Sequence, residues 1–266
     1  MLARAAQAGF TLIEAVMVIV LTGVVIAVVS VFIVPATTAY FATSARAQLT
    51  EQADTAMRRI ARDLTGALPN SVRVTGNARS VELIPVSSAA RYATASGDPL
   101  QFGTADSRFS IIGPPLRISR SGQQLAWYNL GAGTPDADAY AGANVRTTTT
   151  GVGTASTIDI TGSALPTTLM APPYRVYAID PPVTYRCDLT AGTLTRFSGY
   201  GLQSTQPDPP AGGTSAILAR NVSACSFAYD SAALAVRYDL VTLSLSLTSN
   251  GETITLYQAV HVDNLP

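Results

Sequence analysis

A run of twenty almost entirely apolar residues, Ala15 to Val34, dominates the first part of the sequence. No Asp, Glu, Lys or Arg occurs between Glu14 and Arg46. At 1.5 Å per residue, a helix of this length is ~30 Å long, which matches the hydrocarbon core of a bilayer. A cleaved secretory signal has a shorter apolar core that ends at a small-residue cleavage site, whereas this run leads into Pro35. We therefore predict a transmembrane helix over residues 10–34 that stays in the mature protein.

The charges around the apolar run set its predicted orientation. Arg4 and the starting amine precede the run, and the next basic residue is Arg46. Positive charge favours the cytoplasmic side of a membrane helix. The balance predicts a single-pass protein of the inner membrane whose C-terminal domain is periplasmic.

After Pro35, apolar residues recur at three- and four-residue steps, which is typical of one helix face. Charged residues of both signs fill the other positions, where they can form helical ion pairs. Pro35 removes one backbone N–H and is expected to kink or locally open the helix without ending it. We predict an amphipathic continuation over residues 35–68, ended by Pro69. Its apolar face must pack against a folded domain and comprises Leu49, Ala53, Ala56, Met57, Ile60, Leu64 and Leu68.

From Val72 onward the hydrophobic period changes to two, and Gly, Pro, Ser and Asn separate short runs. The clearest hairpin joins residues 241–248 to residues 253–257 through Asn250-Gly251, a dipeptide that favours a tight turn. The predicted fold class is α+β, with the long N-terminal helix packed on a β-rich globular domain of residues 69–266. A hydrophobic content of 47% suffices for one core or for two lobes. Four further strands are predicted around residues 81–84, 109–112, 125–128 and 157–160.

Two segments of the β-rich part have the composition of surface loops. Residues 131–156 are rich in Gly, Ala and Thr, and residues 203–214 contain Pro207-Asp-Pro-Pro. Both are longer than ordinary connections in compact domains, and such loops are mobile or functional. We predict exposed loops at both places.

Charge and cysteine content restrict the possible partners. Charged residues make up 13% of the chain, every basic residue is Arg, and the formal net charge is zero. The chain therefore lacks a positive electrostatic field that would attract polyanions, and a nucleic-acid partner is not expected. The two cysteines, Cys187 and Cys225, are too far apart for a zinc-type ligand pair. Outside the cytoplasm they would form one disulfide, and otherwise they would be two buried thiols.

The sequence lacks the residues of a catalytic site. The single histidine, His261, alternates with Val260 and Val262 in the last predicted strand, so it is predicted to face away from the core. Asp136 and Asp138 have too few oxygen ligands nearby for a calcium loop. No nucleophile elbow or phosphate-binding loop occurs. We expect no enzymatic activity, no metal site and no cofactor.

Glu14 is an unusual residue at the edge of a membrane span, where ionised groups are costly. Cleavage between Gly9 and Phe10 would create a positively charged amine four residues before this acid. The acid of one chain could then neutralise the amine of its neighbour. Alternatively, Glu14 lies at the headgroup boundary without a special role.

The segment Gly9-Phe10-Thr11-Leu12-Ile13-Glu14, followed by the apolar helix, resembles the class III leader of type IV pilins and type II secretion pseudopilins. The resemblance implies that a prepilin peptidase removes the leader, residues 1–9, and that Phe10 is N-methylated. It also implies that Glu14 recruits and registers the subunit in a filament. The implied partners are other major and minor pilins, contacted through the N-terminal helix, and an inner-membrane assembly platform.

Shorter motifs of the β-rich part resemble the MshO-type minor pilins of MSHA pili, with J-type pseudopilins next. This resemblance implies a subunit that initiates or caps a filament. A tip-exposed binding module for adhesion or DNA capture is the alternative, as is a minor pseudopilin of a type II secretion system. The motifs are Ala67–Val74, Tyr185–Asp188, Gly192–Arg196, Cys225–Tyr229 and His261–Pro266.

Overall fold

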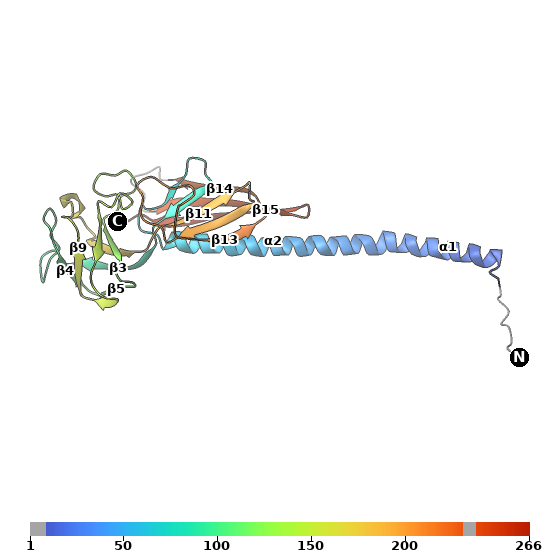
Figure 1. Cartoon of the computed structure of the whole chain (residues 1–266), viewed down its shortest axis with the longest axis horizontal. Helices are drawn as coiled ribbons and strands as arrows, with labels where there is room; N and C mark the ends of the chain where they lie inside the picture. Colours follow the sequence, from blue (N-terminus) through green and yellow to red (C-terminus); the bar gives the residue numbers. More distant parts are fainter. Residues whose placement is uncertain (1–8, 231–237) are drawn as a thin grey trace.

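A single long helix leads into a β-rich head in the computed structural model, which describes residues 9–230 and 238–266 (Figure 1). The helix comprises α1 (Leu12–Val28), a π-helical turn η1 (Val29–Ile33) and α2 (Val34–Thr65). Together they form one rod of 54 residues, ~80 Å long at the usual helical rise. The predicted α+β fold class, a long N-terminal helix followed by a β-rich domain, is confirmed.

The two ends of the helix differ slightly from the predicted ones. The helix begins at Leu12, with Thr11 as its N-cap, rather than at Phe10. It ends at Thr65 with Gly66 at the C-cap, three residues before the predicted end at Leu68. The chain leaves the helix early because the Leu68 N–H donates to the Ile84 carbonyl of the β-rich head (2.7 Å) instead of continuing the helical pattern.

In the part of the head nearer the N-terminus, two antiparallel sheets enclose the second half of α2. The first has the strand order β1 (Arg73–Val74), β2 (Ser80–Leu83), β11 (Val183–Asp188), β12 (Thr193–Ser198) and β13 (Thr214–Arg220). The second has the order β14 (Val222–Asp230), β15 (Tyr238–Ser249) and β16 (Glu252–Asp263). Their inner faces and the apolar face of α2 share one hydrophobic core.

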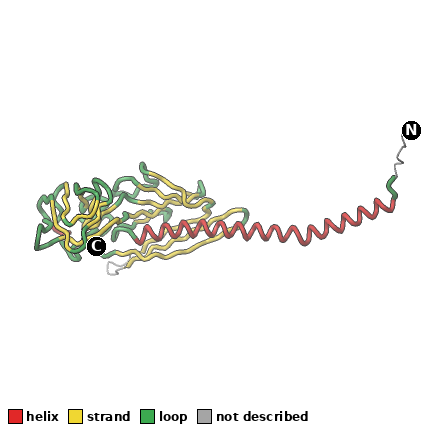
Figure 2. Tube along the Cα trace, turned by 90° about the horizontal axis from the view of Figure 1, so that it is seen from below, coloured by secondary structure: helices red, strands yellow, loops and turns green. Residues whose placement is uncertain are grey.

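The predicted C-terminal hairpin is confirmed as β15 and β16. Ser249 pairs with Glu252 across Asn250-Gly251, and both turn residues have positive φ (51° and 79°), as a type I′ turn requires. Figure 2 shows the hairpin running alongside the helix. The side chains of Arg46 and Glu252 form an ion pair beside this turn.

A second lobe is inserted between two neighbouring strands of the first sheet. Leu83 of β2 and Val183 of β11 are directly paired, yet residues 84–182 separate them in the sequence. We call residues 84–182 the inserted lobe. Its centre is a closed barrel of β10 (Arg175–Ile179), β3 (Val86–Tyr92), β4 (Arg108–Ile112), β9 (Thr157–Thr161), β7 (Val145–Thr148) and β6 (Gln124–Trp127). A short sheet of β5 (Leu116–Ile118) and β8 (Gly153–Ala155) and a 3₁₀ turn η2 (Thr167–Leu169) complete it.

The inserted lobe has a hydrophobic core of its own and lies at the end of the molecule opposite the N-terminus (Figure 1). A third, smaller apolar cluster joins the two lobes and includes Leu68, Tyr140 and Tyr177. The apolar residues of the chain therefore form the cores of two lobes rather than one common core.

The prediction of a long exposed loop over residues 131–156 is wrong. The segment contains β7 and β8, and several of its side chains are buried. Buried Arg146 fixes it, because its guanidinium donates to four backbone carbonyls, those of Ala143, Val145, Ser163 and Ala164 (2.6–3.1 Å). Small residues that suggest a loop in the sequence, such as Ala137 and Ala139, here fill tightly packed positions.

The segment 203–214 is largely a loop, as predicted, but side chains of the first sheet hold it. Arg73 donates to the carbonyls of Gln203 (2.8 Å) and Ser204 (2.7 Å). The carboxylate of Asp208 accepts from Ser80 (2.9 Å) and Arg186 (2.8 Å). These contacts tie the loop to β1, β2 and β11.

Candidate functional site

The predicted cleavage junction lies just before the helix. Gly9 and Phe10 are non-helical, Phe10 is 80% exposed, and residues 1–8 of the predicted leader lie outside the described residues. The Glu14 N–H donates to the Thr11 hydroxyl (3.3 Å), and the Glu14 carboxylate accepts from the Thr11 N–H (3.5 Å). This is a capping box, for which the spacing Thr-x-x-Glu is the sequence signal, and this role of Glu14 was not predicted. Pairing of Glu14 with a neighbouring amine remains a prediction.

The stem of the molecule, which we define as residues 12–45, is exposed over residues 12–41 and only partly covered at Ala42, Ser44 and Ala45. No residue of α1 is buried, and the large apolar side chains of this stretch are exposed. Figure 2 shows the N-terminal part of the helix extending away from the head. Water cannot be the environment of such a surface, since each large apolar side chain gains roughly 1.5–3 kcal/mol on burial. The helix is long and apolar enough to cross a membrane.

Pro35 is accommodated by the π-helical turn that precedes it. The Val34 N–H donates to the Val29 carbonyl, five residues back, where an α-helix would use the fourth. The wider turn makes room for the proline ring, which would otherwise clash with the carbonyl one turn earlier. The prediction that Pro35 locally opens the helix without ending it is confirmed.

The second half of α2 docks on the head through the predicted apolar face. All seven predicted residues are at most 5% exposed, although Leu68 lies beyond the helix end. Asp63 adds a polar lock, because its carboxylate accepts from the Tyr185 hydroxyl (2.6 Å) and from Arg196 (3.0 Å) of the first sheet. Apolar and polar contacts therefore both hold the second half of α2 to the head.

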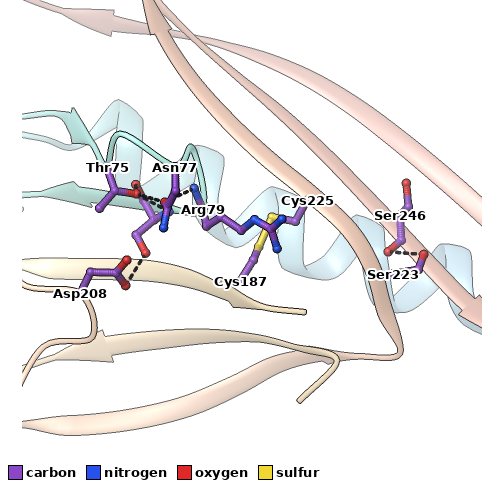
Figure 3. The surroundings of a disulfide bond; sticks show 9 residues. Thr75, Asn77, Arg79, Cys187, Asp208, Ser223, Cys225 and Ser246 are labelled. Carbon is purple, nitrogen blue, oxygen red and sulfur yellow. Dashed lines mark hydrogen bonds between the residues drawn. A yellow bond between two sulfur atoms is a disulfide. The ribbon is translucent and has the colours of Figure 1, made fainter. Parts of the chain in front are cut away.

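A disulfide between Cys187 and Cys225 links the two sheets that enclose α2 (Figure 3). Cys187 lies on β11 and Cys225 on β14, and the Arg79 side chain lies beside the bond. A polar pocket of about 380 Å³ adjoins the disulfide. In the lining of this pocket, Arg186 forms ion pairs with both Asp188 and Asp208. Of the two alternatives for the cysteines, the structure has the disulfide.

A buried polar network connects the first sheet to the inserted lobe. The Glu82 carboxylate is fully buried, and it accepts from Arg73 (2.7 Å) and the Tyr200 hydroxyl (2.9 Å). Burial raises the pKa of Glu82, while the hydrogen bond and positive charge of Arg73 act in the opposite direction. The Arg73 guanidinium also stacks on the ring of Tyr140 from the inserted lobe, 3.6 Å from its centroid. No sequence pattern announced this network, because its members come from separate segments.

The segments that carry the finer resemblance meet in space. Asn70 from the first motif donates to the Asn264 side chain and backbone from the last one (3.0 and 3.2 Å). Asn264 in turn donates to the Tyr229 hydroxyl (3.1 Å). Motifs scattered along the sequence thus hold the C-terminal segment against the junction of the lobes.

The other polar residues considered as site candidates, His261 and Asp138, lie in surroundings typical of a surface residue and of a turn residue. His261 is exposed between buried Val260 and Val262, as predicted. Asp138 accepts three backbone N–H groups, from Gly133, Tyr140 and Ala141, and so caps a turn. Within residues 9–230 and 238–266, no cluster of three or more His, Cys, Asp or Glu could hold a metal ion.

Comparison with known families gives one match. Residues 4–30 match the prokaryotic N-terminal methylation motif, and this range contains the predicted junction and all of α1. Neither characterised proteins nor solved structures gave a match. This motif is the signal of type IV pilins and pseudopilins, and it supports a pilin-like subunit anchored in a membrane by a single helix.

Proposed function

We propose that this chain is a minor pilin that serves as a structural subunit in initiation or tip assembly of a type IV, MSHA-like pilus. The observation that carries the proposal is the inserted lobe, which lies beyond the end of α2 and opposite the stem (Figure 1). In a filament of parallel stems, a further subunit would need the space that this lobe occupies. The chain therefore fits the outer end of the filament better than its shaft.

In this proposal the stem has two successive environments. A prepilin peptidase removes residues 1–9 in the inner membrane, and Phe10 is N-methylated. The assembly platform then extracts the stem, and burial of its apolar surface against other pilins drives packing. The disulfide between Cys187 and Cys225 supports a periplasmic head, because such bonds persist in oxidising compartments.

The proposal is tested on the filament fraction of cells that produce the chain. Mass spectrometry should find a mature chain that begins at N-methylated Phe10. Glu14→Val should insert in the membrane but enter filaments poorly, because the neighbour's amine loses its counter-charge. Glu51→Val is the matched control, since Glu51 is an exposed acid outside the apolar run of the same rod. A chain that retains Met1, or normal incorporation of Glu14→Val, contradicts the proposal.

The finer assignment to an MSHA-like system rests on the resemblance to MshO-type minor pilins. The methylation motif itself is common to pilins and to the pseudopilins of type II secretion. The two systems separate by phenotype. Loss of the chain should reduce surface pili in the first case and protein export in the second.

The inserted lobe favours a second function, that of a tip-exposed binding module for adhesion or DNA capture. It has its own closed barrel and enters and leaves through the paired residues Leu83 and Val183. We infer that the lobe is separable from the assembly role of the stem and the two sheets.

Replacing residues 84–182 by Asn-Gly should join β2 to β11 as a tight hairpin, because Leu83 and Val183 are already paired. We expect piliation to persist and surface attachment or DNA uptake to fall, as measured by electron microscopy and binding assays. Formation of the Cys187–Cys225 disulfide is the control for folding. Loss of pili in a variant with the disulfide intact would show that the lobe joins subunits instead.

A further inference from the structure

The strand β16 is an open sheet edge of unusual length. It pairs with β15 over twelve residues without a register shift, and α2 packs against its inner face. Natural proteins protect long edges with lysine, proline, bulges or short strands. Between Glu252 and Asp263, β16 has none of these and no acidic or arginine side chain. Such an edge is a template for another strand.

The turn geometry identifies the backbone groups that face outward. In the type I′ turn, the Glu252 N–H donates to Ser249, so alternate residues from Glu252 onward bond to β15. The intervening residues, among them Thr253, Thr255 and Tyr257, direct their N–H and C=O groups to the free side. Within the described part of the chain, no protein group bonds to them.

The other open edge, β13, is shorter, with seven residues, and has a bulge at Leu218, so its regular part is residues 214–217. It ends the first sheet, and its residues from Thr214 to Ile217 are exposed. Its only charged residue is Arg220, which has no carboxylate partner among the described residues. Since α2 contacts both β16 and β13, both open edges lie beside the helix.

The directions of the two strands suit neighbours with parallel stems. The start of β16 lies beside Arg46 and its end beside Asn70, so β16 runs in the direction of α2. Thr214, at the start of β13, pairs with Ser198. Ser198 also pairs with Val183, which lies near the C-terminal end of α2. The direction of β13 is therefore opposite to that of α2. In two chains with parallel stems, β16 of one is thus antiparallel to β13 of the other.

We propose that the head docks laterally on a neighbouring pilin-like chain by antiparallel pairing of its β16 edge with the neighbour's β13 edge. A second copy of this chain is the occupant to which the geometry points, because one chain carries both complementary edges. With the stem-proximal ends aligned, Glu252, which also pairs with Arg46 of its own chain, lies near Arg220 of the neighbour, so opposite charges meet. The inference rests on the proposed function only for the parallel orientation of the stems.

Cross-linking in the bacterial inner membrane tests the pairing, because all stems there insert in one direction. Thr255 and Ile217 lie three residues in from Glu252 and Arg220, and both are exposed. Two differently tagged chains, one with Thr255→Cys and one with Ile217→Cys, should form a disulfide-linked heterodimer on oxidation. The two native cysteines are already bonded to each other and do not compete.

Proline provides the matched variants. Tyr257→Pro removes one outward N–H and no bond to β15, and Tyr257→Ala removes the same ring but keeps the N–H. Loss of one backbone hydrogen bond predicts that the heterodimer yield falls about tenfold with proline and stays near that of the parent with alanine. Thr253→Pro and Thr253→Ala repeat the comparison, and circular dichroism verifies that each variant is folded.

Three results overturn the pairing: no heterodimer, equal loss with proline and alanine, or preferential linkage of two Thr255→Cys chains. The last result would mean that β16 of one chain meets β16 of the other instead of β13. Any of them leaves cleavage at Gly9–Phe10 and the effect of Glu14→Val unchanged. A chain that is not processed fails the proposed function, whatever its cross-links.

Discussion

Replacement of Glu82 by alanine should lower the free energy of unfolding by roughly 3–5 kcal/mol, because removal of one partner strands a buried charge. Glu82 is fully buried, and Arg73 is 12% exposed. Without the carboxylate, Arg73 keeps only neutral acceptors, the carbonyls of Gln203 and Ser204, and the ring of Tyr140. Urea unfolding of the mature chain in detergent, followed by circular dichroism, measures the effect.

Glu252→Ala is the matched control for this experiment. It also removes a glutamate paired with an arginine, but the Arg46 side chain of that pair is 65% exposed. Exposed pairs contribute less than about 1 kcal/mol. Equal losses in the two variants would show that burial of the Glu82 network has no bearing on stability.

Loss of the disulfide should have the next largest effect. The bond spans 38 residues, and a cross-link of that span stabilises a protein by roughly 2–4 kcal/mol, mainly by restricting the unfolded chain. We expect this loss of unfolding free energy in the double variant Cys187→Ala, Cys225→Ala, measured by urea unfolding. The native chain in reductant should behave like the double variant.

The two-lobed architecture sharpens this measurement. Trp127, the only tryptophan, is buried in the core of the inserted lobe, so its fluorescence reports on that lobe. The disulfide joins the sheets around α2. Its loss should therefore lower the urea midpoint of unfolding measured by circular dichroism more than the urea midpoint measured by Trp127 fluorescence. If the urea midpoint measured by circular dichroism is unchanged in reductant, with both thiols shown to be free, the expected contribution of the disulfide to stability is contradicted.

The sequence predicted those features that depend on local pattern. The 3.6-residue period located the buried face of α2, and strict alternation with Asn250-Gly251 located β15 and β16. The four other predicted strands are observed as β2, β4, β6 and β9, each within one residue of the expected position. The junction at Gly9 and Phe10 was also visible, because its signal is contiguous.

The features that depend on distant pairing were not predictable in this way. Nothing local shows that Leu83 pairs with Val183, so the insertion was not foreseen. The loop-like composition of residues 131–156 was misleading, because Arg146 organises that segment through backbone carbonyls rather than through an apolar pattern. Sequence signals record what each residue prefers locally, whereas the lobe boundary is set by tertiary contacts.

The π-helical turn before Pro35 changes the angular relation between the two halves of the rod. One extra residue in a helical turn rotates everything before it by about 100° around the axis relative to an unbroken α-helix. A helical wheel drawn straight through Pro35 would therefore assign Glu14 to the wrong azimuth relative to the docking face at Leu49. The side of the stem that meets its neighbours is thus set by this single wide turn.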